Sequence, residues 1–185
     1  PDISSEQDYM NLAASVQLIA ENFMCDIARW ARKNIPSPNL VLMGGCALNC
    51  VANEKIARLE LYDDMWIMPN PGDAGSSLGA ILAHTKIRAN WDGPYLGTDI
   101  TRPFHIGAAV DALCTGDIIG VAQGKAEFGP RALGNRSIIA DPRGGTIKDR
   151  VNDIKKRQRF RPFAPIVLEH LAAQYFDMPV ETSPY

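Results

Sequence analysis

Apolar residues recur at three- and four-residue steps over positions 5–34, which is the spacing of one face of an α-helix. Ser5 is a good N-cap, and Asp8 three residues later completes a capping box. Pro36 and Pro38 then end the pattern. We predict one long helix whose apolar stripe covers a sheet or another helix; the stripe consists of Leu12, Val16, Ile19, Phe23, Ile27 and Trp30.

Short continuous apolar runs at 39–43 and 65–68 follow this helix and indicate buried strands of an α/β sheet. The first run ends in Gly44-Gly45 and a helical pattern follows over 53–59, whereas the second leads through a Pro-rich turn into a helix over 72–83. A strand, a glycine turn and a helix can hold a nucleotide against backbone N–H groups. An ordinary tight turn has the same pattern, so both interpretations stay open.

Positions 90–103 show neither period and are rich in Gly, Pro and Asp, which is typical of a connection between domains. We therefore predict a first domain over 1–95, a linker over 96–104 and a second domain over 105–185. In the second domain the pattern predicts helices over 108–113 and 146–156, and strands over 118–122, 137–140 and 166–168.

Charge is distributed unevenly along the 185 residues, although the net charge is only −2. Residues 120–162, hereafter the basic segment, contain 11 Lys and Arg against 4 acidic residues, a net charge of +7. The rest of the chain has 8 against 17, a net charge of −9. Such polarity indicates an anionic ligand for the basic segment, although a charge run is often only a solvated face.

The richest anion-binding chemistry lies at 124–137. Arg131 and Arg136 are planar forks that can grip a phosphate or carboxylate through two bonds, and Lys125 adds a point charge. Gly129 and Gly134 let backbone N–H groups approach an oxyanion. Because the aromatic residues of the segment lie in turn-like contexts, the pattern favours a closed anion pocket over a nucleic-acid stacking platform.

Asp73 stands in the N-terminal turn of the helix predicted at 72–83, where it can hold a metal or simply cap the helix. The three histidines are scattered and Cys46-x-x-x-Cys50 lacks zinc spacing, so the chain alone spells out no complete metal site. Four cysteines without a disulfide framework, and no apolar run near the ~20 residues that span a bilayer, predict a cytoplasmic protein without membrane contact. The start at Pro1 leads us to expect a piece of a longer chain that is inactive as a transferase in isolation.

Four ordered blocks of sequence resemble one family. They are Met-Gly-Gly-Cys-Ala-Leu-Asn at 43–49, Pro-Gly-Asp-Ala-Gly-Ser-Ser-Leu-Gly-Ala at 71–80, Glu-Phe-Gly-Pro-Arg-Ala-Leu-Gly-Asn-Arg-Ser at 127–137 and Phe-Arg-Pro-Phe-Ala-Pro at 160–165. In this order they resemble the O-carbamoyltransferases of nodulation-factor and antibiotic tailoring (NodU/CmcH type).

This resemblance implies an α/β protein in which 1–95 is the second lobe of an actin-like, sugar-kinase-like (ASKHA) ATPase fold. Residues 105–185 would begin a YrdC-like α/β domain. In the family, ATP and carbamoyl phosphate form carbamoyl-adenylate and pyrophosphate in the YrdC-like domain. The carbamoyl group then moves to a hydroxyl of a small-molecule acceptor in the actin-like domain, beside a divalent metal.

The resemblance also implies roles for individual residues. Asp73 matches a ligand of iron or magnesium whose other ligands lie outside this chain. Lys125 stands where an Arg is common, and Gln158 where a Glu is common. Lys125, Arg131 and Arg136 match the catalytic block; the ATP- and carbamoyl-phosphate-binding positions are Gly44, Gly45, Asn49, Ser137, Arg143 and Arg161.

Two other functions stay open. The chain can be a nucleotide-binding module of the actin-like superfamily without transferase activity, or an RNA-binding, tRNA-modification-related piece. A homodimer is one option for its assembly. Turnover of carbamoyl phosphate separates the enzyme from the module, and a steep salt dependence of RNA binding would favour the RNA-binding function.

Overall fold

The computed structural model describes residues 4–180 and 183. They divide into two compact units, residues 4–87 with 177–180 and 183, and residues 88–176. The division falls between Ile87 and Arg88, ahead of the linker that the sequence predicted at 96–104. Both units mix helices and strands, so the predicted α/β class is confirmed at this level. No helix of the described residues is both long enough and apolar enough to cross a bilayer.

The first unit opens with the predicted long helix. α1 spans Glu6–Asn34, and Ser5 and Asp8 form the capping box: the Asp8 N–H donates to Ser5 Oγ, and the Ser5 N–H donates to Asp8 Oδ2. The helix ends before Pro36, where Ile35 is the C-cap in an extended conformation. The capping box and the proline therefore set both ends of the helix.

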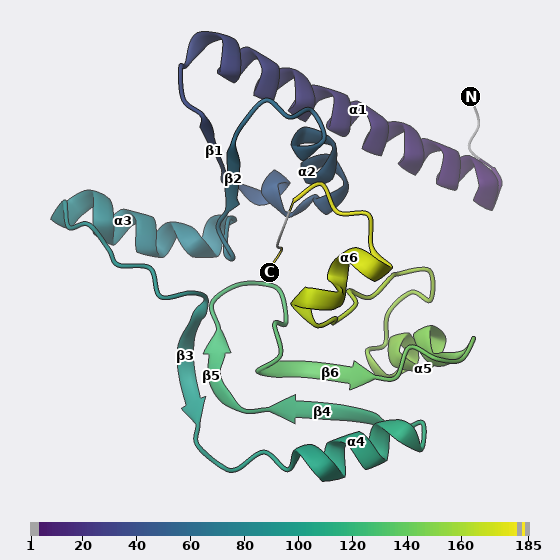
Figure 1. Cartoon of the computed structure of the whole chain (residues 1–185). Helices are drawn as coiled ribbons and strands as arrows, with labels where there is room; N and C mark the ends of the chain where they lie inside the picture. The colour runs from purple at the N-terminus through teal and green to yellow at the C-terminus, as the bar shows by residue number, and fades with distance from the viewer. Residues whose placement is uncertain (1–3, 181–182, 184–185) are drawn as a thin grey trace. The chain divides into compact units, whose positions relative to one another are not determined.

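Two parallel strands form the sheet of this unit, as the apolar runs predicted. β1 (Asn39–Leu42) pairs with β2 (Asp64–Ile67), with Leu40 opposite Met65. η1 (Gly45–Leu48) and α2 (Cys50–Ala57) connect them, so α2 begins earlier than the helix predicted at 53–59. Figure 1 shows α1 running past α2 and this sheet. β2 leads through η2 (Asp73–Gly75) into α3 (Ser76–Thr85).

The core of the first unit is small and lies between α1, α2 and the sheet. Cys25, Ala28 and Ile56 are buried there, and Leu40 and Met65 pack against them. Tyr62 donates its hydroxyl to the carbonyl of Ala28 at 2.8 Å, and further partly buried neighbours are Met24, Leu42 and Leu59.

The predicted orientation of α1 is wrong. Its buried residues are Glu21, Cys25 and Ala28, whereas the stripe expected to face inward is exposed in the described structure, with Ile19 at 68% and Trp30 at 63%. The reason is that α1 packs through small and polar residues. Small side chains allow a close approach to α2 and the sheet, and the larger apolar face is left outward.

Charged and amide side chains fasten α1 to α2. Buried Glu21 forms an ion pair with Lys55 and accepts a hydrogen bond from Gln17 at 2.7 Å. The Lys55 hydrogen bond, followed by the Gln17 bond, lowers the pKa of Glu21, while burial opposes the shift. Gln17 also exchanges hydrogen bonds with Asn49, both at 3.1 Å. The carboxylate therefore stays ionised where it is buried.

The second unit contains two antiparallel strand pairs. β3 (Tyr95–Ile100) pairs with β5 (Gly124–Glu127), and β4 (Ile118–Ala122) pairs with β6 (Arg136–Ala140). α4 (Ile106–Cys114) precedes β4, and α5 (Ile147–Ile154) follows β6. The chain then continues to η3 (Glu169–Leu171) and α6 (Ala172–Tyr175). The strands predicted at 118–122 and 137–140 are confirmed.

Two predictions for this unit are wrong. The segment taken for a linker contains β3, and Gly97 lies against β5 so closely that an added Cβ would be 2.8 Å from the Cβ of Ala126. A glycine that resembles a turn signal is therefore a close contact between strands. No strand forms at 166–168, where Ile166 and Leu168 are exposed and lack a partner strand in the described residues.

Replacing Gly75 by Ala should destabilise the first unit by at least about 2 kcal/mol. The new Cβ would lie 1.9 Å from the backbone oxygen of Asn70, which cannot move aside as a flexible side chain can. Gly79→Ala is the matched control in α3, because nothing lies within 4 Å of its added Cβ. Since Ala favours helix, the control should be neutral or up to about 1 kcal/mol more stable. Chemical unfolding followed by circular dichroism measures both, and equal midpoints would contradict the close packing at Gly75.

Candidate functional site

The loop between β5 and β6, residues 128–135, lies within the run richest in anion-binding residues. Its first N–H group, that of Phe128, donates to the carbonyl of Pro94 at 2.6 Å. Near its end, the carbonyl of Leu133 accepts a hydrogen bond from the Tyr95 hydroxyl at 3.0 Å. Pro94 directly precedes β3, and Tyr95 is the first residue of that strand. Residues 94 and 95, just ahead of the predicted linker, therefore hold the loop in place.

The carboxylate of Glu127 gathers the backbone donors of this loop. Its Oε1 accepts hydrogen bonds from the N–H groups of Leu133 at 2.9 Å, Asn135 at 2.8 Å and Arg136 at 3.1 Å. Gly134 has φ +104, which lets the chain turn there, and its own N–H donates to Ser137 Oγ at 2.9 Å. The sequence predicted that Gly129 and Gly134 let backbone N–H groups approach a bound oxyanion. In the structure, three N–H groups of this region meet the Glu127 carboxylate instead.

The electrostatics of Glu127 follow from these bonds. Partial burial is the largest single influence and raises its pKa, but the hydrogen bonds from Leu133, Arg136, Asn135 and its own N–H together outweigh it. The net result is a lowered pKa. Hydrogen bonds to the charged form favour that form, so Glu127 is an anion at neutral pH.

Whereas Glu127 accepts hydrogen bonds from backbone N–H groups, the Arg136 guanidinium donates them to backbone carbonyls. Its shortest hydrogen bonds are 2.7 Å to the Gln123 carbonyl and 2.8 Å to the carbonyls of Thr98 and Asn135. Its two η-nitrogens donate to four backbone carbonyls, those of Thr98, Gln123, Gly124 and Asn135. The guanidinium thus joins β3, the start of β5 and the start of β6. The contacts that its η-nitrogens make are with the backbone of this chain. The catalytic role of Arg136 remains a prediction.

Lys125 and Arg131, the other two residues predicted to act in catalysis, are both exposed. Lys125 is on β5 opposite Asp99, and Arg131 is within the loop. Ser137, on β6, holds the loop through Gly134. The structure therefore brings Arg136, Ser137 and the loop of Arg131 together around Glu127, a residue to which the sequence assigned no function. The signal available was its position as a lone acid in a run of cations.

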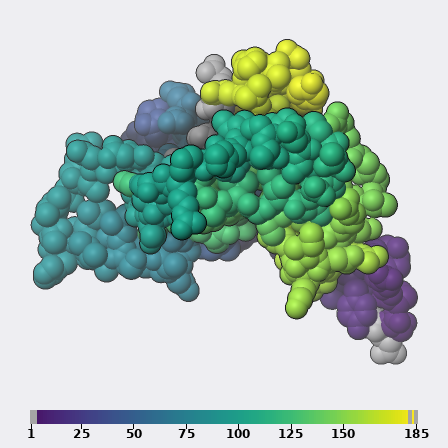
Figure 2. Space-filling model, turned by 90° about the horizontal axis from the view of Figure 1, so that it is seen from below, coloured from purple at the N-terminus to yellow at the C-terminus, as the bar shows by residue number. Residues whose placement is uncertain are grey.

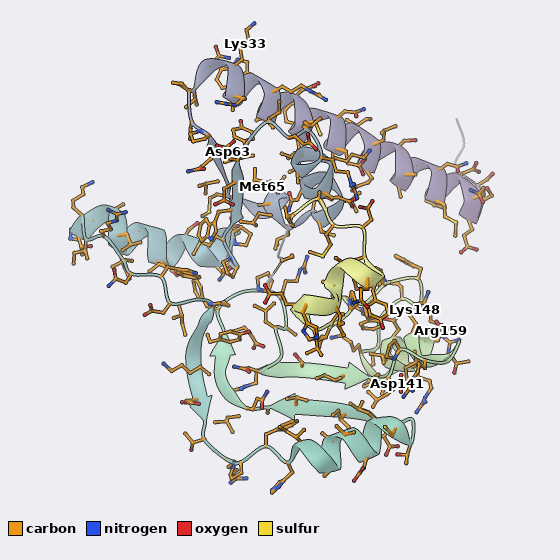
Figure 3. All side chains as sticks on the ribbon, viewed as in Figure 1. Lys33, Asp63, Met65, Asp141, Lys148 and Arg159 are labelled. Atoms are coloured by element: carbon orange, nitrogen blue, oxygen red, sulfur yellow. The ribbon has the colours of Figure 1, made fainter. Side chains whose placement is uncertain are left out.

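Arg143 lies apart from this cluster, at the other end of β6. Its Nε lies 2.9 and 2.8 Å from the two carboxylate oxygens of Asp141, and its Nη2 completes the ion pair. This contact lowers the pKa of Asp141 to about 2. Figure 3 labels Asp141 at the end of β6, with Lys148 and Arg159 on the α5 side of the same unit.

A hollow of about 430 Å³ lies beside this ion pair, between the end of α4 and the start of α5. Arg150 lines it and donates to the carbonyl of Gly116, another lining residue, at 3.1 Å. Polar groups of its lining come from Cys114, Thr115, Gly116, Asp141, Arg143, Thr146 and Arg150. The other residues predicted to bind substrate are absent from that lining, so the structure does not collect all of them around one hollow.

The end of the basic segment is organised by Asn152, which is fully buried. Its Nδ2 donates to the carbonyls of Arg159 at 3.2 Å and Arg161 at 3.0 Å, and its Oδ1 accepts from Arg157 Nε at 2.5 Å. The Arg157 guanidinium also stacks over the Phe163 ring, 4.3 Å from its centre. Arg161 itself is exposed and donates to Gln158 at 2.7 Å. In the space-filling view the chain around 150–160 (yellow-green) stands at the surface (Figure 2).

In the first unit, the turn after β1 meets the segment after β2. Gly44 has φ +90, and its N–H donates to the Pro71 carbonyl at 2.8 Å. Gly45 opens η1 directly beside it. Asn49 caps α2, since its Oδ1 accepts from the Ala52 N–H at 3.2 Å. The two glycines therefore lie close to the segment that leads into Asp73.

Asp73 is exposed and does not cap a helix. The N-cap positions of η2 and α3 belong to Gly72 and Gly75, and neither helix has a side-chain cap. The capping alternative is therefore wrong. Among residues 4–180 and 183, no group of three or more His, Cys, Asp or Glu side chains could hold a metal ion together. The assignment of Asp73 to a metal remains a prediction.

Two family descriptions match this chain in order. "Carbamoyltransferase N-terminus" matches residues 2–82, and "Carbamoyltransferase C-terminus" matches residues 110–185. The matches cover most of the first unit and most of the second.

Individual relatives give the same result. Nodulation protein NolO of Bradyrhizobium diazoefficiens is 38% identical over an alignment of 200 positions. The alignment covers 94% of this chain and 36% of the relative. Nodulation protein U of Azorhizobium caulinodans is 36% identical, with 87% and 31% covered. The 3'-hydroxymethylcephem-O-carbamoyltransferase of Amycolatopsis lactamdurans is 35% identical, with 80% and 32% covered. The chain thus spans about a third of the length of these curated relatives.

Replacing Arg136 by Lys should lower the free energy of unfolding of the second unit by about 2 kcal/mol, because one ammonium group cannot bond all four of the backbone carbonyls that the guanidinium bonds. The control is Arg102→Lys, at an exposed position between β3 and α4, which should change stability by less than about 0.5 kcal/mol. Thermal and urea unfolding measure the difference. Wild-type stability of Arg136→Lys would show that its backbone contacts contribute nothing.

The Asp141–Arg143 pair predicts a defined pH dependence. The pKa of Asp141 is about 2 in the folded protein and near its ordinary value of 3.8 in the unfolded chain, so the stabilisation is fully present above about pH 4. It should decline as the pH falls from about 4 to about 2. Urea midpoints measured across this range should fall less in Asp141→Asn than in the wild type. Parallel curves would contradict the assignment.

Proposed function

Because this chain belongs to the carbamoyltransferase family, we propose that it takes part in an ATP-dependent transfer of the carbamoyl group of carbamoyl phosphate to a small-molecule hydroxyl. For the atoms to balance, water splits carbamoyl phosphate into carbamate and phosphate. A carbamate oxygen attacks the α-phosphorus of ATP, and pyrophosphate leaves. The acceptor hydroxyl then attacks the carbamoyl carbon of carbamoyl-adenylate, and AMP leaves.

One observation carries the proposal: the basic segment, with a net charge of +7, lies in the unit matched by the carbamoyltransferase C-terminus. ATP and carbamoyl phosphate together bring about six negative charges into one site, and phosphoryl chemistry depends mainly on positioning and neutralising such charges. We assign Lys125 and Arg131 to the phosphate groups. Arg136 adds its charge beside them while it holds the backbone. Further contacts to ATP or carbamoyl phosphate are assigned to Ser137, Arg143 and Arg161.

We assign the first unit, by the family resemblance, to the second lobe of an actin-like fold and to the transfer step. Gly44 and Gly45 would lie against adenosine, and Asn49 would support that turn from the start of α2. Asp73 would be one ligand of a divalent ion, iron or magnesium; both metals accept carboxylate oxygen. An exposed carboxylate that caps no helix is available for that purpose. A bound ion there would supply positive charge beside the transferred group.

The second unit would then be the YrdC-like part in which carbamoyl-adenylate forms. All four cysteines are free thiols, which supports a reducing, cytoplasmic location. The proposed acceptor is a small-molecule hydroxyl, in line with the 3'-hydroxymethylcephem named as the acceptor of the Amycolatopsis lactamdurans relative. A homodimer remains an option for the assembly.

Titration of the purified chain with ATP, and separately with carbamoyl phosphate, tests this proposal. Both should bind. Arg131→Lys should weaken each by roughly 10- to 100-fold, about 1.5–3 kcal/mol, because Lys keeps the charge but loses the fork. The melting temperature, measured on the same preparations, separates a loss of binding from a loss of folded protein, and Arg102→Lys, outside the basic segment, should bind both ligands normally.

Other outcomes point to the other functions. Binding of ATP without carbamoyl phosphate would favour a nucleotide-binding module that lacks transferase chemistry. RNA binding that weakens steeply with added salt would favour a nucleic-acid partner. Wild-type affinities in Arg131→Lys at an unchanged melting temperature would remove this residue from the phosphate site.

A further inference from the structure

Glu127 differs from the other acidic residues of the basic segment. Asp141 is paired with Arg143, Asp153 with Arg159, and Asp149 also acts on Arg159 through its charge. The hydrogen bonds to Glu127 come instead from backbone N–H groups. Three acids thus neutralise cations that the segment carries, whereas Glu127 takes up donors of the main chain.

We propose that Glu127 is a positioning residue, a built-in anion that fixes the backbone of residues 133–136 and through it the loop of Arg131 for binding of phosphate groups. That Glu127 fixes this backbone follows from its three hydrogen bonds with the N–H groups of Leu133, Asn135 and Arg136. The phosphate-binding part rests on the function proposed above. Three N–H groups that converge on one oxygen form a nest that an external anion would otherwise occupy.

The contacts around the nest explain how one carboxylate can set a whole loop. Asn135 is held twice, because its N–H donates to Glu127 and its Nδ2 donates to the Lys125 carbonyl at 2.8 Å. Arg136 is also held twice, through its N–H by Glu127 and through its guanidinium by the carbonyls of neighbouring strands. Residues 129–132, which include Arg131, lie between this fixed end and the anchor at Phe128. Tyr95 and Ser137 also hold this end, through Leu133 and Gly134, so loss of the Glu127 bonds loosens the end that sets the position of Arg131.

Two substitutions separate charge from shape. Glu127→Gln keeps the length and one acceptor oxygen but loses the negative charge. Glu127→Ala removes the acceptor entirely and leaves three N–H donors without it. Glu169→Gln is the matched control, because Glu169 is an exposed acid of the same unit, in η3.

The test combines amide hydrogen exchange with a pyrophosphate titration, both followed by NMR on the purified chain. In Glu127→Ala, exchange at Leu133, Asn135 and Arg136 should rise at least about tenfold, and pyrophosphate should bind roughly tenfold more weakly. Amides of β4 and of residues 137–140 in β6 should keep their protection. Glu127→Gln should fall between Glu127→Ala and the wild type, and Glu169→Gln should match the wild type.

Added acetate should re-occupy the nest in Glu127→Ala and restore both amide protection and pyrophosphate affinity. If acetate fails to restore amide protection, the proposal that Glu127 acts as a built-in anion is wrong. Faster exchange with wild-type pyrophosphate affinity would overturn the positioning role and leave the proposed function standing. A wild-type chain that does not bind pyrophosphate would sink the proposed phosphate site and the positioning role with it, whatever the exchange rates.

Discussion

A loop that carries cations must also satisfy its own backbone, and in the second unit two side chains of opposite charge do so. Glu127 accepts from N–H groups, and Arg136 donates to carbonyls. A polar group left without a partner away from water costs about 1–3 kcal/mol, so these contacts decide the loop's conformation. At the end of the basic segment, buried Asn152 donates to two backbone carbonyls and accepts from the Arg157 side chain. The shape of the segment therefore depends on side-chain-to-backbone bonds more than on an apolar core.

Local sequence signals predicted the regular elements well where the chemistry was local. The capping box and prolines gave both ends of α1, and apolar runs gave β1, β2 and β4. β5 was missed because Gly-Lys-Ala-Glu has neither alternation nor an apolar run; it forms because β3 pairs with it. The inward face of α1 was misjudged because close packing selected small residues there. Such contacts depend on elements distant in sequence, which a local pattern cannot contain.

The candidate site shows the same limit. The glycines and backbone N–H groups predicted a bound oxyanion, whereas in the structure three of these N–H groups donate to the Glu127 carboxylate. A local pattern cannot tell an internal carboxylate from a bound ligand, since both satisfy the same donors. The family resemblance, carried by four ordered blocks, is confirmed by the two matched regions. For Asp73 the structure removes the capping alternative. Beside it, Gly75 is required by the backbone of Asn70, so that glycine has a packing reason independent of any ligand.

The way Glu127 and Arg136 make their contacts has an evolutionary consequence. Each binds backbone atoms, which every residue type supplies, apart from the N–H that proline lacks. A change at Leu133 or Thr98 therefore leaves the partner atom in place, and no second substitution can compensate for loss of the carboxylate or the guanidinium. Among relatives, the positions of Glu127 and Arg136 should therefore show no pairwise covariation with the residues whose backbone they bond. Covariation should report instead the side-chain pairs, such as Glu21 with Lys55, in which both partners can be exchanged together.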